Sequence, residues 1–116
     1  MDSRERLVRR YYEAIDEEEY DGVFDLFSDD VVYHRPGRSS IEGIEAFEEF
    51  YLDERSLEDG THDMEDVLLA GDTAIVRGRF TGRQNGEKVE FGFVDLHEFE
   101  GEEIQRRWTY TDRGEV

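Results

Sequence analysis

The sequence predicts an α+β fold in which three amino-terminal helices pack on a curved, mostly antiparallel sheet. Apolar and aromatic residues recur at helical spacing in the first half of the chain. The second half alternates apolar and polar residues over long runs that are separated by turn signals, a pattern typical of a strand meander. With 116 residues and no internal repeat, we expect a single domain over 1–116.

The helices are expected before the middle of the chain. A capping-box pattern followed by an apolar stripe predicts the first helix over 3–18. A short second helix around Phe24 should end at 28–30, ahead of a brief strand over 31–35. The third helix is expected over 42–55.

Strands follow to the end of the chain. Two runs, 62–70 and 73–83, read as neighbouring strands. An Asn-Gly pair at 85–86 is the strongest short signal for a hairpin and should lead into a strand over 89–99. A last turn then precedes a final strand over 103–112.

Asp95 is the most informative residue of this meander. Alternation places it on one face of its strand together with several apolar side chains and a histidine: Val89, Phe91, Phe93, His97 and Phe99. If this face is buried, desolvation raises the pKa of Asp95, and a neutral acid becomes a hydrogen-bond donor inside a cavity. The plainer alternative is an ion pair with an arginine on a neighbouring strand, for which the candidates are Arg77, Arg79, Arg106 and Arg107.

Three stretches carry a resemblance: 8–15 together with 26–31, then 43–51, and finally 94–99 with the following turn and Ile104. They resemble the nuclear-transport-factor-2-like (NTF2-like) superfamily, in particular its SnoaL-like and ketosteroid isomerase-like members. The resemblance implies a cone-shaped α+β fold around a cavity. It implies further that Tyr11 donates a hydrogen bond to a substrate oxyanion and that Tyr51 supports Tyr11. Asp95 matches the second hydrogen-bond donor of the ketosteroid isomerases, which is a protonated aspartic acid. This residue of the isomerases is also the standard example of a carboxylic acid that stays neutral at pH 7.

One position departs from the isomerase pattern. The isomerases carry their general-base aspartate immediately before a proline, whereas here Arg35 precedes Pro36. His34 is the nearest residue that could serve as a base, since its ordinary pKa of about 6.5 suits proton transfer near neutrality. His34 and Arg35 face opposite ways on a strand. If Arg35 enters the cavity, it could pair with an ionised Asp95 and orient a water molecule, as the resemblance to epoxide hydrolases implies.

The sequence therefore favours a cofactor-independent isomerase, cyclase or lyase that moves a proton on a small hydrophobic carbonyl compound. Tyr11, Asp95 and His34 are the candidate catalytic residues. The candidate binding residues are Phe24, Phe27, Tyr33, Arg35, Phe47, Phe50, Tyr51, Phe91, Phe93, His97 and Trp108. His62 begins a strand and is expected to face solvent. The alternatives are a non-catalytic ligand-binding or dimerisation module of the same fold, and epoxide hydrolysis by Arg35 and Asp95.

Composition limits the partners. The chain has 14 Lys and Arg against 32 Asp and Glu, a net charge of −18 that disfavours nucleic acid and anionic membranes. Such acidity is typical of proteins from a salt-rich, halophilic cell interior, and the alternative is an acidic interaction surface for a cationic partner. Cysteine is absent and the three histidines have no metal-ligand spacing, so we expect no metal and no cofactor. Without a leader or membrane span, a cytoplasmic location is expected. The resemblance also implies a homodimer formed through the exposed sheet face.

Overall fold

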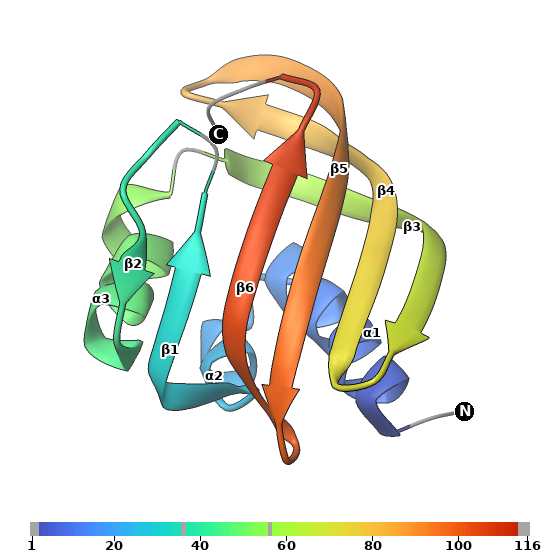
Figure 1. Cartoon of the computed structure of the whole chain (residues 1–116). Coiled ribbons are helices and arrows are strands. Elements are labelled where there is room, and N and C mark those ends of the chain that lie inside the picture. The colour runs from blue at the N-terminus through green and yellow to red at the C-terminus, as the bar shows by residue number, and fades with distance from the viewer. Residues whose placement is uncertain (1–2, 36, 56, 114–116) are drawn as a thin grey trace.

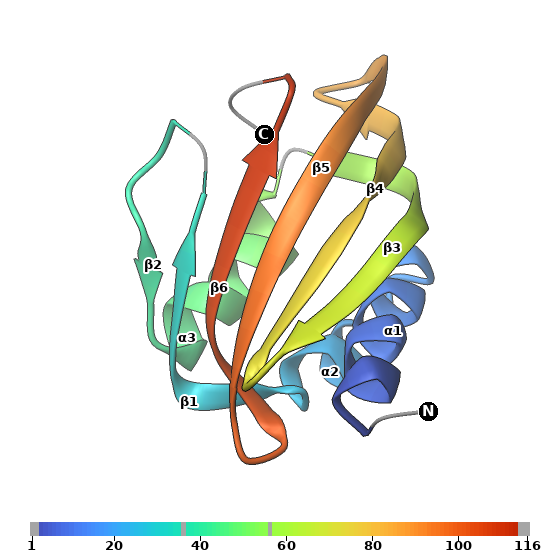
Figure 2. The same cartoon turned by 45° about the vertical axis from the view of Figure 1, so that its right-hand side comes forward.

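The computed structural model describes residues 3–35, 37–55 and 57–113. Within these ranges the chain forms three α-helices, one π-helical turn and a six-stranded sheet (Figure 1). The helical elements are α1 (Ser3–Asp16), α2 (Tyr20–Phe24), α3 (Ile44–Glu49) and the π-helical turn η1 (Phe50–Glu54). The helices lie on one side of the curved sheet (Figure 2), which is the predicted α+β arrangement. No helix in the described part of the chain is long and apolar enough to span a membrane.

The sheet has the strand order β2-β1-β6-β5-β4-β3. Its strands are β1 (Phe27–His34), β2 (Ile41–Glu42), β3 (Leu57–Ala70), β4 (Thr73–Gln84), β5 (Glu87–Glu100) and β6 (Glu103–Thr111). The pairing of β1 with β6 is parallel, and the other pairings are antiparallel. Because α1 lies across the sheet from one end, helix and strands enclose a cone-shaped core (Figure 1).

Local signals explain most of these elements. The apolar stripe of α1 is the buried face of that helix, with Val8, Tyr11 and Ile15 almost without solvent contact. The hairpin between β4 and β5 turns at Asn85 and Gly86, whose φ angles of 52° and 86° are those that the Asn-Gly signal favours. Alternation along β5 is regular and buries Asp95 and His97 among phenylalanines.

Three boundaries differ from the prediction. The second helix ends at Phe24, and residues 27–30 belong to β1, because Phe27 pairs with Ile104 of β6. The third helix is split, since α3 changes to the π-helical turn η1 at Phe50, and residues 41–42 form β2. Strand β3 begins at Leu57 and is five residues longer at its start than alternation indicated. These pairings join distant segments, so local periodicity does not reveal them.

Candidate functional site

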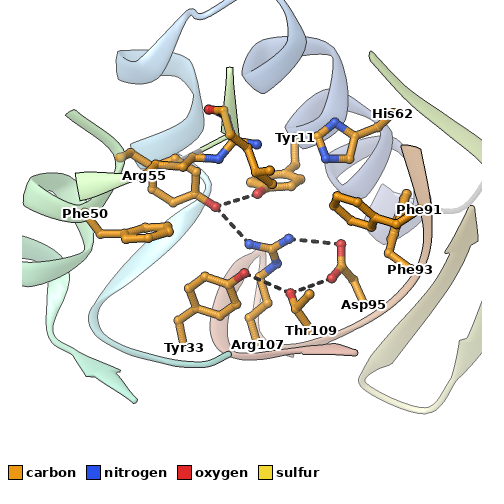
Figure 3. A pocket seen from close by; sticks show the side chains of 12 residues that line it. Tyr11, Tyr33, Phe50, Arg55, His62, Phe91, Phe93, Asp95, Arg107 and Thr109 are labelled. Carbon is orange, nitrogen blue, oxygen red and sulfur yellow. Dashed lines mark hydrogen bonds and ion pairs between the residues drawn. The ribbon is translucent and has the colours of Figure 1, made fainter. Parts of the chain in front are cut away.

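A cavity opens between α1, η1 and the inner face of the sheet (Figure 3). Its walls leave about 470 Å³ unoccupied by atoms, part of it open to solvent. The lining residues are Tyr11, Tyr33, Phe50, Tyr51, Arg55, Leu57, His62, Phe91, Phe93, Asp95, Arg107 and Thr109. Aromatic rings form most of the wall, and the polar groups are few and clustered, as in small-molecule sites.

Asp95 sits at the base of this cavity with 2% of its surface exposed. Its Oδ2 accepts hydrogen bonds from Tyr12 Oη at 2.6 Å and from Arg107 Nη2 at 2.9 Å. Its Oδ1 accepts a hydrogen bond from Thr109 Oγ1 at 2.6 Å. The predicted burial of Asp95 is confirmed, and the carboxyl group is held by three donors from one helix and one neighbouring strand.

These donors decide the charge of Asp95. Burial by itself raises the pKa of the carboxyl group, but the positive charge of Arg107, the electrostatic contribution of His97 and the hydrogen bonds from Thr109 and Tyr12 outweigh it. The resulting pKa of Asp95 lies below its usual range, so the group is an ionised acceptor. The expectation of a neutral, donating acid is therefore wrong, and the alternative of an ion pair with Arg107 is correct.

Arg107 is the central cation of the site. It is 3% exposed, its Nη2 contacts Asp95, and its Nη1 donates to Tyr51 Oη at 2.8 Å. Its guanidinium carbon lies 4.6 Å from the ring centre of Tyr11 and 4.5 Å from that of Tyr33. Two tyrosine faces and one carboxylate thus stabilise a charge that would otherwise be costly to bury.

The tyrosines form a chain of hydrogen bonds that starts at Arg107. Tyr11 Oη and Tyr51 Oη are 2.5 Å apart, so the structure places Tyr51 where the resemblance implied, next to Tyr11. Because Tyr51 Oη accepts from Arg107, its own proton can be donated to Tyr11. Tyr11 is then left with a hydroxyl proton for the cavity. Burial raises the pKa of Tyr11 well above its usual value, which keeps that proton on the oxygen.

His62 and Asp16 form a second polar pair at the cavity wall. The two Asp16 carboxylate oxygens bind His62 Nδ1 at 2.6 Å and the His62 backbone N–H at 2.8 Å. The Asp16 carboxylate accepts a hydrogen bond from Nδ1–H, so the proton of the neutral imidazole stays on Nδ1 and Nε2 carries the lone pair. Burial lowers the pKa of His62, and the hydrogen bond to Asp16 offsets this only in part, so the imidazole is neutral near pH 7.

His97 lies behind Asp95 and does not line the cavity in the described part of the chain. It is fully buried, and its Nε2 is 2.9 Å from Tyr12 Oη. Since Tyr12 donates its proton to Asp95, it accepts from His97, which assigns the proton of His97 to Nε2. Burial lowers the pKa of His97 to about 3, so it stays neutral and supports the buried network.

Comparison with known proteins assigns the chain to a family. A family model described as a SnoaL-like domain matches residues 8–107. The chain belongs to the SnoaL-like family. Solved structures, among them proteins described as NTF2-like, share the fold of this chain at low sequence identity. No protein with a curated description matches the sequence.

Three solved structures illustrate the range of the SnoaL-like fold. An NTF2-like protein of unknown function from Burkholderia pseudomallei has a TM-score of 0.86 at 19% identity, over 97% of this chain and 92% of that one. A putative SnoaL-like polyketide cyclase from Jannaschia sp. CCS1 has a TM-score of 0.80 at 19% identity, over 96% and 86%. An LEH-like epoxide hydrolase from Mycobacterium tuberculosis has a TM-score of 0.84 at 19% identity, over 96% and 84%.

Two predicted site residues of the SnoaL-like domain lie outside its cavity. His34 stacks on Trp108 with ring centres 5.2 Å apart and planes 13° apart. The register of β1 with β6 pairs these two residues, and alternation along β6 turns Arg107 and Thr109 inward and Trp108 outward. His34 is therefore misassigned as the base, and Trp108 as a cavity residue.

Arg35 was expected to pair with Asp95 in one hypothesis, and this is also wrong. Its guanidinium carbon lies 4.4 Å from the ring centre of Phe50, and Arg107 occupies the place beside Asp95. Among the predicted aromatic lining residues, Tyr33, Phe50, Tyr51, Phe91 and Phe93 contribute to the cavity. The others fill the core next to it, where Phe27 and Phe24 contact Phe47 at 4.4 and 6.3 Å between ring centres.

Sequence reasoning named Arg107 only as one of four possible ion-pair partners of Asp95, and it did not assign Tyr12, Asp16, His62 or Thr109 to the site. Alternation along 103–112 puts Arg107 and Thr109 on one side of the strand, and this is the sequence signal that could have placed both on the face of Asp95. His62 was expected to face solvent, but its side chain is only 9% exposed because β3 crosses the end of α1 at Asp16. In the described part of the chain, no three His, Asp or Glu side chains gather as a metal site.

Proposed function

We propose that this SnoaL-like domain is an acid–base catalyst that moves a proton next to the carbonyl group of a small ligand, as an isomerase, cyclase or lyase. The observation that supports this most is the meeting of a base and a donor in one cavity. His62 is held in its basic tautomer by Asp16, and Tyr11 lines the same space with a hydroxyl proton to donate (Figure 3).

His62 has the properties that a general base needs. Its Nε2 bears the lone pair, its orientation is fixed by two hydrogen bonds to Asp16, and it is neutral near pH 7. The rings of Phe80 and Phe93, 4.9 and 5.4 Å from the imidazole centre, limit water around it. A positioned base of this kind contributes roughly 10²–10⁴-fold to a proton transfer.

Tyr11 would donate a hydrogen bond to the carbonyl oxygen and stabilise the negative charge that develops there. The charge of Arg107 polarises Tyr51, which polarises Tyr11, so each hydroxyl becomes a stronger donor. Asp95 balances Arg107 and keeps it in place without itself giving up a proton. Removing one such donor typically lowers turnover by about 10²–10³-fold. The site needs no cofactor for this chemistry.

Deuterium exchange tests the proposal. Acetophenone and 3-benzoylpropionate are incubated with the protein in D₂O, and loss of the proton signal next to the ketone is followed by NMR. We expect exchange above the buffer rate, and a loss of at least about 10²-fold in His62→Gln. His34→Gln is the matched control, because His34 lies on the outer face of the sheet. Equal exchange in His62→Gln and the parent would contradict the proposal.

A second candidate is hydrolysis of a small epoxide, favoured by the ionised state of Asp95 beside Arg107. One solved relative is described as an LEH-like epoxide hydrolase. In this reaction an ionised Asp95 would take a proton from an attacking water while Tyr11 protonates the epoxide oxygen. Styrene oxide in H₂¹⁸O would then yield labelled diol with the parent and none with folded Asp95→Asn. Exchange without diol formation excludes this candidate, and a protein that binds ligand without either reaction is a binding module.

We also propose that two copies pair through the outer face of the sheet. Val94, Leu96 and Trp108 face outward there and are only half-buried, and the neighbouring Tyr110 is 55% exposed. Apolar side chains that lie together on an exposed surface often mark a site where another protein binds. Light scattering should give twice the chain mass, and Trp108→Glu should give the single-chain mass. A monomeric parent would contradict this proposal.

A further inference from the structure

Arg55 is the second cation of the cavity, and the π-helical turn determines its position. The Arg55 backbone N–H donates to Phe50 O at 2.7 Å, which closes the wide turn of η1. With φ −65° and ψ 124°, Arg55 then leads the chain in extended form toward β3. Single π-helical turns within helices are frequent at functional sites.

The charge of Arg55 is not matched by a carboxylate among the described side chains. Its Nη1 donates to Leu57 O at 3.0 Å, and its guanidinium carbon lies 5.7 Å from the ring centre of Tyr51. Arg107, by contrast, donates from both of its terminal nitrogens, to Tyr51 through Nη1 and to Asp95 through Nη2. Arg55 therefore keeps donors that can bind a further acceptor.

The cavity lining thus differs in charge from the rest of the molecule. The whole chain carries −18, yet in the lining Asp95 cancels Arg107, His62 is neutral, and Arg55 adds one positive charge. Arg55 is also among the charges that lower the pKa of His62, so its field reaches the base. An anionic ligand is repelled by most of this acidic protein, but the local positive charge of Arg55 attracts such a ligand into the cavity.

We propose that Arg55 binds a carboxylate of the substrate, so that the cavity takes a small oxo acid. Guanidinium binds carboxylate through two parallel hydrogen bonds, which fixes orientation as well as position. The carboxylate lies at Arg55, the ketone oxygen faces Tyr11, and the C–H next to the ketone faces His62. This assignment of substrate class builds on the proposed function, whereas the carboxylate site itself is independent of it.

The chemical step follows from this placement. His62 Nε2 takes the proton, the C–H electron pair forms a carbon–carbon double bond, and the carbonyl π electrons move to the oxygen that Tyr11 hydrogen-bonds. The proton on His62 then returns to the enolate at the same or another carbon, which gives exchange or isomerisation with no oxidant or reductant. The carboxylate stays bound to Arg55 and takes no part in bond changes.

Binding of benzoate and its neutral isostere benzamide tests the site. By calorimetric titration the parent should bind benzoate at least about tenfold more tightly than benzamide. Arg55→Gln should lose this preference, and Arg55→Lys, which keeps the charge, should retain part of it. Arg106→Gln is the control for net charge, because Arg106 is exposed and pairs with Glu98 at 3.8 Å away from the cavity.

Several outcomes would overturn the inference. They are equal affinity of the parent for both ligands, no benzoate binding at millimolar concentration, and an unchanged preference in Arg55→Gln. Thermal unfolding of each variant checks that it is folded. If Arg55→Gln does not fold, Arg55→Lys still tests the inference. Benzoate binding without any deuterium exchange would overturn the proposed function alone. Equal exchange of acetophenone and 3-benzoylpropionate would overturn the carboxylate assignment alone.

Discussion

Replacing Asp95 by Asn should destabilise the protein strongly, although the two side chains have nearly the same shape. The substitution removes the charge that balances Arg107, and Arg107 is only 3% exposed, so water compensates its charge poorly. It also turns an amide N–H₂ toward Tyr12, Thr109 or Arg107, which all donate to Asp95. At least one buried donor then has no acceptor.

The size of the effect follows from breaking a buried ion pair. Removing one partner of such a pair typically lowers the free energy of unfolding by roughly 3–5 kcal/mol. For a domain of this length, each kcal/mol lost from the free energy of unfolding lowers the melting temperature by about 4 °C. We therefore expect the melting temperature to fall by roughly 12–20 °C. Scanning calorimetry and urea unfolding at pH 7 measure both quantities.

Two comparisons make this prediction specific. Asp66→Asn breaks an ion pair with Arg77 whose side chains are 44% and 63% exposed, and it should change stability by less than about 1 kcal/mol. The double variant Asp95→Asn/Arg107→Met removes the unpaired charge and should recover part of the loss. A fall in melting temperature of less than about 4 °C in Asp95→Asn, or no recovery in the double variant, would refute the reasoning.

Three other outcomes follow from the geometry. Because the pKa of His97 is about 3 in the folded state and near 6.5 when unfolded, the unfolded state binds more protons between these values. The unfolding free energy should therefore fall by roughly 3 kcal/mol from pH 6.5 to pH 4, and His97→Gln should flatten that profile in urea titrations. Tyr11→Phe should lower the exchange rate by about 10²-fold and Tyr51→Phe by less, since only Tyr11 faces the reacting oxygen; the reverse order would contradict the proposed chain of donors. A Cβ at Gly60 would lie 2.2 Å from Cε2 of Phe80, so Gly60→Ala should lose about 1–3 kcal/mol in thermal unfolding, and an unchanged melting temperature would contradict this close packing.

Periodicity predicted the parts of this fold that depend on near neighbours. The stripe through Val8, Tyr11 and Ile15 is a property of one helix, and the turn at 85–86 is a property of two residues. Asp95 was placed correctly because alternation along one strand determines which side chains share a face. The link between acidity and a salt-rich cell, drawn from composition, stays a prediction.

The missing parts of the site depend on contacts between distant segments. Asp16 and His62 are 46 residues apart, and nothing local to either predicts that β3 crosses the end of α1. Asp95 was given the wrong charge because its environment was judged from its own strand, where phenylalanines dominate the face that it shares. The deciding residue, Arg107, comes from the next strand, and a pKa depends on the nearest charge as much as on burial.

The buried ion pair also explains why this cavity can be active without a protonated acid. An ion pair of this depth adds little stability compared with apolar side chains of the same volume, because both charges are desolvated. Apolar replacements, however, could not polarise Tyr51 and through it Tyr11. Arg107 supplies the positive field, Asp95 makes its burial tolerable, and the tyrosines carry the effect to the cavity. Stability and catalysis should therefore respond differently to substitution. The double variant Asp95→Asn/Arg107→Met should be more stable than Asp95→Asn, but its rate of deuterium exchange should be no higher.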